Sequence, residues 1–594
     1  MLKKLALCLA LVLPLPLFAQ TAPPGGKSLF DKAGLEALQL DGDKSMGTME
    51  KVPVTGQAFK DAVVLTTLKT GTNPWSVQVD AVCTSAVRTG DVILCQFSMR
   101  AADTHVESGE AKSEFDFERN GDPWTKAATY ALSAGPQWKL YSIPFTAVED
   151  LDAGKSHICI RMGYTPQAFE LANLTLVDYG TSKKLSDMPQ TKVSYEGADA
   201  DASWRQAAQD RIEKLRKGDL TVTVEGKDGN PVTGAKVSIR MKKQAFGFGT
   251  AVVAQKLAQA GDENTEYQKQ VERLFNRIVF ENDLKWGPWE DGAANTGYWR
   301  RSYVDEALKW LSARNIDVRG HNMVWGSWRW LPASMKSLSG DPKALEAAVE
   351  KRIQDVGTAM DGKVIEWDVV NEPVPEHDLT DILGKSAMVT WYQAARKVDH
   401  HALLFVNDYP SPDTTGHLEG YDQDIQFLLD NHAPLQGVGL QGHVGGSPWS
   451  IPALLATLDK LGAHGLPIEI TEYDTDIKDD ALDAQFFKDF LIAIYSHPSV
   501  EGFLMWGFWD GAHWHHKAPL FNQDWSPKPS EKVWEDLVLH DWWTNAEGTT
   551  DDTGAYKLRG FLGDYDVTVN QGGKTVTLHA KLTKAGLALP VTLK

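Results

Sequence analysis

The sequence predicts a multidomain protein in which a (β/α)8 barrel is accompanied by two β-sandwiches. Its length of 594 residues exceeds what one hydrophobic core supports, since single cores stop growing near about 250 to 300 residues. Residues 40–179 read as short alternating strands between turn signals, whereas residues 246–539 alternate apolar strand-like runs with helical stretches. Strand-rich pieces at 219–241 and 548–594 flank the alternating region.

The first 19 residues read as a bacterial-type signal peptide. Two lysines precede an apolar run from Leu5 to Phe18, and the small residue Ala19 follows it. A membrane anchor is the alternative, but the run contains two prolines and is shorter than the roughly 20 residues that a spanning helix needs. We therefore expect cleavage near Ala19, a secreted or periplasmic protein, and no membrane association after cleavage.

The charge and composition favour a neutral partner. The formal net charge of −19 becomes −21 once Lys3 and Lys4 leave with the signal peptide, which argues against binding nucleic acid or an anionic membrane through a basic face. The chain contains 21 Trp and 15 Tyr, and such flat amphipathic rings pack on the apolar faces of sugars. Core packing is the alternative for most of these rings.

Three cysteines remain after the signal peptide: Cys83, Cys95 and Cys159. Two interpretations stay open, namely a bridge between Cys83 and Cys95 on neighbouring strands, or three reduced cysteines in the core. No CxxC motif or Cys/His spacing indicates a zinc site. We therefore expect no metal and no cofactor.

Residues 20–180 are assigned to the first β-sandwich. Its predicted strands alternate in period two between turns, and they are Val77 to Val82, Val92 to Met99, Lys139 to Ile143, His157 to Met162 and Leu171 to Val177. The ending RMGYTPQAFELANLTLVDYG (Arg161 to Gly180) resembles the last strands of carbohydrate-binding jelly rolls found beside xylanases. The resemblance implies a carbohydrate-binding-module-like domain, although such modules also occur as inert spacers. Either a sugar-binding platform or core packing would explain Trp75, Trp124, Trp138 and Tyr164.

A helical linker is assigned to residues 181–218, because apolar residues recur at helical spacing from Trp204 to Leu215. The following segment, Asp219 to Met241, alternates in period two around the turn Asp228-Gly229-Asn230-Pro231, which predicts a β-hairpin. Gly548 to Leu582 is also strand and turn.

Together these two strand-rich pieces resemble the halves of one small β-sandwich of the carboxypeptidase-regulatory-like kind. Its halves are assigned to residues 219–244 and 541–594. Because an isolated hairpin is marginal in water, we expect the halves to share one core, with the barrel inserted between them. Two independent appendages are the alternative.

The barrel is assigned to residues 245–540, where eight strand candidates can be counted. They are Phe246 to Ala251, Arg277 to Glu281, Asp317 to His321, Val364 to Asn371, Leu403 to Asn407, Gly437 to Gln441, Ile468 to Thr471 and Gly502 to Gly507. Eight such units in about 300 residues fit a (β/α)8 barrel, whose catalytic groups lie at the C-terminal ends of the strands.

Most of these strand candidates end in polar or aromatic residues, among them Glu281, His321, Asn371, Asn407, Gln441 and Trp506. A polar cap explains any single one, but six or more on one rim indicate a site. Glu372 and Glu472 each directly follow a buried strand. A glycosidase needs two carboxyl groups, one protonated to release the leaving oxygen and one ionised to attack the anomeric carbon or activate water. The sequence therefore predicts a glycosidase site around Glu372 and Glu472.

A set of motifs across the barrel resembles glycoside hydrolase family 10, the endo-1,4-β-xylanase family. The matching blocks, in family order, are FENDLKW (Phe280 to Trp286), RGHNMVW (Arg319 to Trp325), WDVVNEP (Trp367 to Pro373), NDY (Asn407 to Tyr409), GVGLQGH (Gly437 to His443), ITEYD (Ile470 to Asp474) and WGFWDGAHW (Trp506 to Trp514).

The resemblance implies a role for each matching residue. Glu372 matches the general acid/base, Glu472 the nucleophile and Asn371 the residue that hydrogen-bonds the sugar 2-hydroxyl, while His443 would hold Glu472 in place. The other matching residues would contact the substrate; they are His321, Gln441 and Trp506 around the same sugar, Glu281, Asn282 and Lys285 around the next sugar outward, and Trp325 and Trp514 as aromatic surfaces.

This chain departs from the family pattern at Gly326 and Trp328, where many members carry His and Gln, and at His515, where Arg is frequent. The first two changes put the outer donor subsites in question.

The resemblance implies a secreted, monomeric, retaining endo-1,4-β-xylanase that acts on xylan by double displacement. A sibling β-1,4-glycanase or transglycosylase on the same scaffold is the alternative enzyme. A non-catalytic polysaccharide-binding protein is disfavoured, because both carboxylates are present.

Overall fold

The computed structural model describes residues 22–104, 110–191, 194–412 and 415–593. The chain divides into two compact units, Met1–Val193 and Ser194–Lys594. The predicted signal peptide, residues 1–19, lies outside the described residues. No helix in the described part of the chain combines the length and apolarity needed to cross a membrane.

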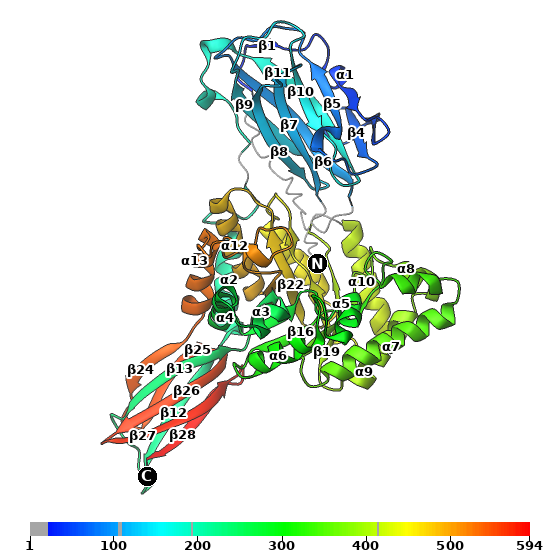
Figure 1. Ribbon diagram of the computed structural model, residues 1–594. Coiled ribbons are helices and arrows are strands. Elements are labelled where there is room, and N and C mark those ends of the chain that lie inside the picture. Colours follow the sequence, from blue (N-terminus) through cyan, green and yellow to red (C-terminus); the bar gives the residue numbers. More distant parts are fainter. Residues whose placement is uncertain (1–21, 105–109, 192–193, 413–414, 594) are drawn as a thin grey trace, which may run out of the picture. The chain divides into compact units, whose positions relative to one another are not determined.

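The first unit is a β-sandwich of two antiparallel sheets (Figure 1). One sheet has the order β3-β4-β11-β6-β9, with β1 paired to β11, and the other has the order β2-β5-β10-β7-β8. The bounds are β1 (Lys27–Ser28), β2 (Gln39–Gly42), β3 (Gly47–Pro53), β4 (Asp61–Thr67), β5 (Val77–Val82), β6 (Val92–Thr104), β7 (Ala111–Arg119), β8 (Lys126–Ala134), β9 (Lys139–Thr146), β10 (Ser156–Arg161) and β11 (Gln167–Asp178), with a short helix α1 (Gly34–Ala37).

Alternate residues of both sheets form one core, which contains Leu65, Phe97 and Phe169 from the first sheet and Val79, Phe115 and Ile158 from the second. This alternation is the period-two pattern that the sequence shows. Cys83, Cys95 and Cys159 are all buried and free, so the structure has the three reduced cysteines rather than the bridge.

The second unit begins with helix α2 (Ser203–Leu215), which packs against the barrel helix α12 (Asp480–Ser496). Trp204, Ala208 and Ile212 on its apolar face join the barrel core. Arg205 forms an ion pair with the buried Asp489 of α12 at 2.6 Å. The helix assigned to a linker is therefore fastened to the barrel along its length.

The predicted (β/α)8 barrel is confirmed. Its eight parallel strands are β14 (Gly247–Val252), β15 (Arg277–Phe280), β16 (Asp317–Gly320), β18 (Glu366–Asn371), β19 (Leu403–Asp408), β20 (Gly437–Leu440), β22 (Ile468–Thr475) and β23 (Val500–Met505). The sheet closes because β14 pairs with β23 and β16 pairs with β18. Short strands β17 (Val324–Trp325) and β21 (His443–Val444) pair in parallel with β18 and β22 at the rim.

Helices connect these strands in βα units. They are α3 (Ala254–Ala258), α4 (Asp262–Leu274), α5 (Trp286–Asp291), α6 (Arg301–Ser312), α7 (Pro342–Met360), α8 (Asp378–Leu383), α9 (Ala387–Val398), α10 (Thr415–Asp430), α11 (Ile451–Gly462), α12 and α13 (Pro529–Trp534). The apolar spacing of such helices buries one face against the strands, as Val349, Ile353 and Val356 of α7 show.

The two strand-rich pieces of sequence form one small β-sandwich in the second unit. Strand β12 (Lys217–Gly226) lies between β25 (Ala555–Phe561) and β28 (Leu587–Leu593), while β13 (Lys236–Gln244) lies between β24 (Asn545–Thr549) and β26 (Gly563–Gln571). Strand β27 (Lys574–Leu582) completes the second sheet. Val222, Val237 and Val567 are fully or almost fully buried in the shared core.

The predicted hairpin between Asp219 and Met241 is wrong. Strands β12 and β13 lie in different sheets, and the pairing across their connection is a single bridge between Glu225 and Pro231. The physical reason is that both strands bury their alternate apolar residues in the space between two facing sheets. Each strand then forms its ladder with C-terminal strands.

Arg216 connects the small sandwich to the barrel at the N-terminal end of β23. Its buried guanidinium donates to the carbonyl oxygens of Tyr495 at 2.6 Å, His497 at 2.8 Å and Val500 at 2.6 Å. The same guanidinium stacks over the rings of Phe246 and Tyr495. Because Arg216 directly precedes β12, the start of the sandwich is fixed to the strand β23 that closes the barrel.

We expect Val567→Ala to loosen both halves of the small sandwich together. Loss of two buried methyl groups costs about 2 to 3 kcal/mol, so amide hydrogen exchange should accelerate in peptides from β12 and β26 alike and stay unchanged in the barrel strands. Lys574→Ala at the exposed start of β27 is the matched control, with an effect within about 0.5 kcal/mol. Faster exchange in β26 without faster exchange in β12 would contradict a shared core.

Candidate active site

Glu372 and Glu472 lie at the C-terminal rim of the barrel, and each side chain is 5% exposed. Glu372 directly follows β18, and its backbone N–H donates to the carbonyl oxygen of Asn407 at 2.7 Å. Glu472 lies in β22, and its N–H donates to the carbonyl oxygen of Gln441 at 2.8 Å. Glu372 has a φ of 54°, a left-handed conformation that a non-glycine residue adopts at a cost and that clusters at functional sites.

Two side chains hold the carboxyl group of Glu372. Trp325 Nε1 donates to Oε2 at 2.9 Å, and Gln441 Nε2 donates to Oε1 at 2.8 Å. Both partners were predicted as site residues. The indole of Trp325 therefore serves as a hydrogen-bond donor in addition to the aromatic surface that the sequence suggested.

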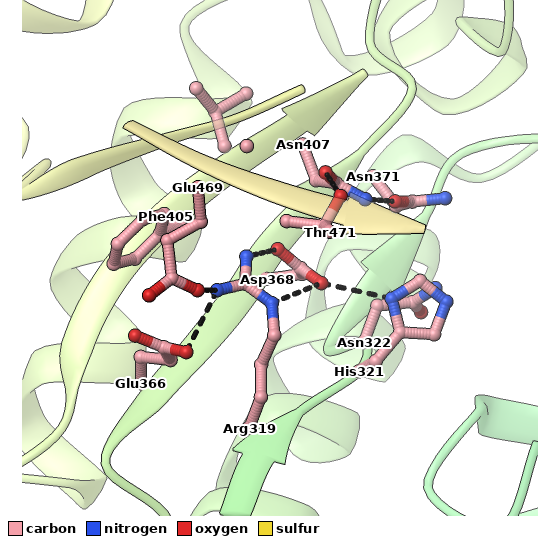
Figure 2. Close-up of polar contacts among 12 residues, drawn as sticks. Arg319, His321, Asn322, Glu366, Asp368, Asn371, Phe405, Asn407, Glu469 and Thr471 are labelled. Atoms are coloured by element: carbon pink, nitrogen blue, oxygen red, sulfur yellow. Dashed lines mark hydrogen bonds and ion pairs between the residues drawn. The ribbon is translucent and has the colours of Figure 1, made fainter. Parts of the chain in front are cut away.

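Asn407 holds the carboxyl group of Glu472 and links it to Asn371. Its Nδ2 donates to Glu472 Oε1 at 2.6 Å and to Asn371 Oδ1 at 2.9 Å, and its Oδ1 accepts from Thr471 Oγ1 at 2.7 Å. Figure 2 shows Asn407, Asn371 and Thr471 grouped around these contacts. Sequence reasoning placed Asn407 in a matching block but gave it no role; its position at the end of a buried strand was the available signal.

His443 bridges Glu472 and Asp474. Its Nδ1 lies 2.8 Å from Asp474 Oδ1, and its Nε2 lies 3.4 Å from Glu472 Oε2. Burial alone would lower the pKa of His443, but the two carboxylates raise it well above its usual range. The imidazole is therefore charged at neutral pH and places a positive charge beside Glu472. Asp474, which also accepts from Trp514 Nε1 at 2.7 Å, is a further site residue that the sequence analysis did not assign.

Beneath the rim, Arg319 occupies the barrel interior with no exposed surface. Figure 2 shows its guanidinium between Glu366 and Glu469 on one side and Asp368 on the other. Glu366 and Asp368 point inward because they alternate with Trp367 and Val369 along β18. Asp368 Oδ2 in turn lies 2.9 Å from Nδ1 of His321. Arg319 therefore positions His321 through Asp368.

Three carboxyl groups share two guanidinium groups in this interior network, because Arg277 also contacts Glu366 and Glu469. Burial would raise the pKa of Glu366, but Arg277 and Arg319 hold it below its usual range. Burial, together with the neighbouring charge of Glu366, raises the pKa of Glu469 to about 8. The opposite shifts of this coupled pair favour one proton shared within Glu366 and Glu469, with Glu469 as its preferred site, and such a proton would balance the charges of the network.

Asn371 Nδ2 and Gln441 Oε1 are buried beside the carboxyl pair and have no hydrogen-bond partner within the described part of the chain. A donor and an acceptor of this kind suit the hydroxyl groups of a sugar, since buried polar groups are normally satisfied. Gln441 donates directly to Glu372, and Asn371 is linked to Glu472 through Asn407.

The remaining predicted residues come together beside this pair. The Lys285 ammonium lies 5.1 Å from the ring centre of Trp325 and 5.5 Å from that of Trp506, and it donates to Asn282 Oδ1 at 2.9 Å. His321 packs edge-on against Trp506 at 5.0 Å. Burial raises the pKa of Glu281, with Lys285 opposing the shift. Glu281, Asn282 and Trp514 line a cavity of about 260 Å³ together with Tyr298, Trp299 and His513.

The departures from the family pattern have local causes. A Cβ atom at Gly326 would lie 2.6 Å from the carbonyl oxygen of Glu376, so histidine would not fit here without a backbone shift. Trp328 is half-buried against the barrel core, while the next aromatic residue, Trp330, stacks on Trp325 with ring centres 4.3 Å apart. In this chain, aromatic rings occupy the loop where the family pattern has polar side chains.

Comparison with known proteins identifies a family for the barrel. The family model described as Glycosyl hydrolase family 10 matches residues 238–536. The chain is 33% identical over 372 residues to the anti-sigma-I factor RsgI6 of Acetivibrio thermocellus, covering 62% of this chain and 47% of that protein. It is 31% identical over 362 residues to endo-1,4-beta-xylanase 1 of Arabidopsis thaliana, covering 60% of this chain and 37% of that protein. The chain thus spans about half or less of these relatives.

Among solved structures, a GH10 endoxylanase retrieved from a sugarcane soil metagenome aligns over 50% of this chain and 97% of its own, with 26% identity and a TM-score of 0.44.

The proton on Glu469 leads to a prediction for stability against pH. Unfolding lowers the pKa of Glu469 from about 8 to about 4.3, so between these values the folded state holds a proton that the unfolded state has lost. Stability of the protein therefore falls as pH rises through this window. The Glu469→Gln variant has no titratable group at this position. The difference between its unfolding temperature and that of the unmodified protein should therefore increase in favour of the variant as pH rises from about 5 to about 8.

The exposed Glu350→Gln on α7 is the matched control and should show a constant difference over the same pH range. A constant difference for Glu469→Gln as well, or one that shrinks with rising pH, would contradict the assigned proton.

Proposed function

The chain belongs to glycosyl hydrolase family 10, and from this premise we propose that it is a retaining endo-1,4-β-xylanase that cleaves xylan by double displacement. The observation that carries the proposal is the pair of buried carboxyl groups, Glu372 and Glu472, each held by different donors at one barrel rim. The name of the Arabidopsis relative adds support for xylan as substrate.

In the first step, a carboxylate oxygen of Glu472 attacks the anomeric carbon while the bond to the leaving oxygen breaks. Glu372 gives its proton to that oxygen, so the leaving sugar departs as a neutral alcohol. Asn407 and the charged His443 keep Glu472 oriented for attack. The product of this step is an ester between Glu472 and the sugar.

In the second step, water attacks the anomeric carbon and the ester bond to Glu472 breaks. Glu372, now deprotonated, takes the proton from water and returns to its starting form. The neutral ester at Glu472 no longer repels the charge of Glu372, which favours the deprotonated base at this stage. One carboxyl group therefore serves both half-reactions.

Gln441 suits both protonation states of Glu372. Its amide nitrogen donates to Glu372 Oε1 at 2.8 Å, which matches the carboxylate, and its Oε1 has no partner within the described residues. A half-turn of the amide would present Oε1 to a protonated Glu372 as an acceptor, and amide orientation is assigned from such networks. Asn371 Nδ2 is the proposed donor to the sugar 2-hydroxyl, a contact that strengthens in the transition state.

We also propose export of the protein and an accessory sugar-binding role for the first unit. The apolar leader of residues 1–19 and the acidic net charge support the proposal of export. For the first unit, the supports are its sandwich architecture and the exposure of Trp75 (56%) and Trp124 (50%), which are not core residues. We further propose that the protein acts on xylan as a monomer.

Chromatography of the products from arabinoxylan, glucuronoxylan and β-glucan tests the substrate. We expect a ladder of xylo-oligosaccharides from both xylans and little product from β-glucan. Products from β-glucan alone would favour the sibling glycanase instead.

Retention of anomeric configuration is the first mechanistic prediction. Two carboxyl groups that work by double displacement lie about 5 to 5.5 Å apart, which leaves no room for an intervening water. Proton NMR during hydrolysis of a xylo-oligosaccharide should therefore show the β-anomer first, with the α-anomer appearing later by mutarotation. An α-anomer in the earliest spectra would overturn the double-displacement assignment.

The two carboxyl groups should respond differently to substitution. Glu472→Gln should abolish turnover of every substrate, because no nucleophile remains. Glu372→Ala should reduce kcat/KM on xylan by about 10²- to 10⁴-fold and spare formation of the ester from an aryl xylobioside with a good leaving group, which needs no proton. Steady-state and burst kinetics measure both effects.

Added azide should accelerate the Glu372→Ala variant, because a small anion replaces water without needing a base, and should leave Glu472→Gln inactive. Glu350→Gln, on an exposed helix face, is the control and should match the unmodified enzyme. Equal losses on xylan and on the aryl substrate in Glu372→Ala would contradict its role as acid.

A further inference from the structure

The first unit contains a cluster of metal-binding side chains on the face of its second sheet that points away from the sandwich core. His157 and Cys159 lie two residues apart on β10, so they share a face, while Ile158 between them belongs to the core. Glu118 of β7 lies opposite His157 in the register, and Asp80 of β5 lies opposite Cys159. Three neighbouring strands therefore bring a thiol, an imidazole and two carboxyl groups together.

The distances among these groups match the edges of a tetrahedral metal site. Cys159 Sγ lies 3.5 Å from His157 Nε2 and 3.4 Å from Glu118 Oε1, and the latter two atoms are 3.3 Å apart. Zinc bonds of about 2.3 Å to sulfur and about 2.0 Å to nitrogen or oxygen would place tetrahedral ligand atoms about 3.3 to 3.6 Å apart. All three separations lie in that range.

Asp80 completes the arrangement on the other side of the imidazole. Its Oδ2 lies 3.7 Å from His157 Nδ1, and one ligand atom from each of Asp80, His157 and Cys159 lies within 4.8 Å of the others. Metal-binding histidines usually donate their second ring N–H to a carboxylate, which fixes the ring. Oδ1 of Asp80 is buried and has no hydrogen-bond partner in the described part of the chain.

The carboxyl groups of Asp116 and Glu118 already have basic partners, whereas that of Asp80 is paired with His157. Arg161 and Lys126 each contact both Asp116 and Glu118. Asp80, in contrast, has no Lys or Arg nitrogen within 4.0 Å among the described residues, and it forms an ion pair with His157. His157 and Glu118 are 2% and 3% exposed, and Cys159 is fully buried. A bound dication would add positive charge beside the Asp80 carboxyl group.

We propose that Cys159, His157 and Glu118 bind a divalent metal of the zinc class, with the carboxyl group of Asp80 facing Nδ1 of His157 as a neighbouring negative charge. Binding forms the metal–sulfur bond and releases the thiol proton of Cys159 to solvent. A thiolate–imidazole–carboxylate set selects zinc over calcium or magnesium, which prefer oxygen ligands. The half-exposed Trp124 ring, 6.0 Å from the His157 ring, lies beside the site.

The metal would cross-link β7 and β10 of the first unit, with Asp80 of β5 beside it, and would be independent of the chemistry of the barrel. Spacing along the chain did not indicate the site, because the ligands come from separate strands and only His157 and Cys159 are close in sequence. A hydrogen-bonded polar cluster without metal is the competing explanation, and it predicts no metal affinity.

Cobalt titration of the full chain without its leader, residues 20–594, tests the proposal. After removal of metals by a chelator, we expect one equivalent of Co²⁺ to produce a thiolate-to-cobalt charge-transfer band, and one equivalent of Zn²⁺ to remove it. Zinc should also raise the unfolding temperature of the first unit. Absence of the band, or a band that needs a large excess of cobalt, would overturn the site.

Variants assign the ligands. Cys159→Ser should lose the charge-transfer band, while Cys83→Ser, another buried cysteine outside the cluster, should keep it. Asp80→Asn should keep the band and weaken zinc affinity by about 10- to 100-fold. A band that persists in Cys159→Ser would refute the proposed ligand. Should Cys159→Ser fail to fold, X-ray absorption of the zinc-loaded unmodified chain decides, with one sulfur near about 2.3 Å expected and an all-oxygen shell refuting the proposal.

Discussion

The buried guanidinium of Arg319 is the interaction on which the active-site rim depends. It has no exposed surface and contacts carboxyl groups from two other barrel strands, Glu366 and Asp368 on β18 and Glu469 on β22. A buried charge is tolerated when its partners are held in good geometry, and removing one partner is costly. The strands that present Glu372 and Glu472 are therefore tied together directly beneath them. Asp368 passes this constraint to His321, which fixes one wall of the site.

Above that network, the two carboxyl groups are distinguished by their partners rather than by their exposure, which is the same for both. Glu372 is contacted by a Trp and a Gln side chain, of which the amide can reverse its polarity. Glu472 is contacted by Asn407 and by His443, whose charge is maintained by Asp474. Glu372 thus has a partner, the Gln441 amide, that can either donate to it or accept from it, whereas Glu472 lies beside a donor and a positive charge. This difference is what an acid/base and a nucleophile at one rim require.

Strand positions and the two carboxyl groups at strand ends, Glu372 and Glu472, could be predicted from sequence, because a parallel barrel needs regular apolar runs with polar residues at their ends. Partners could not. The period-two pattern of β12 and β13 fixes which face of each strand is buried, but it does not say which strand lies beside it, and this is why the hairpin was predicted wrongly. Arg319, Asn407 and Asp474 were seen as members of motifs without roles, since their roles consist of contacts with residues far along the chain. The cluster around Cys159 was missed for the same reason, because its side chains come from separate strands.

The insertion of the barrel into the small sandwich makes the two folds depend on each other. Strands β12 and β25 pair along seven residues although more than 300 residues separate them in sequence. Bringing such distant segments together carries a loop-closure cost that grows slowly with length, and a folded barrel removes most of that cost because its first strand β14 pairs with its last strand β23. Arg216 then bonds the carbonyl groups around the start of β23. Closure of the barrel thus brings the ends of the inserted segment together, and the sandwich in turn holds those ends, so each stabilises the other.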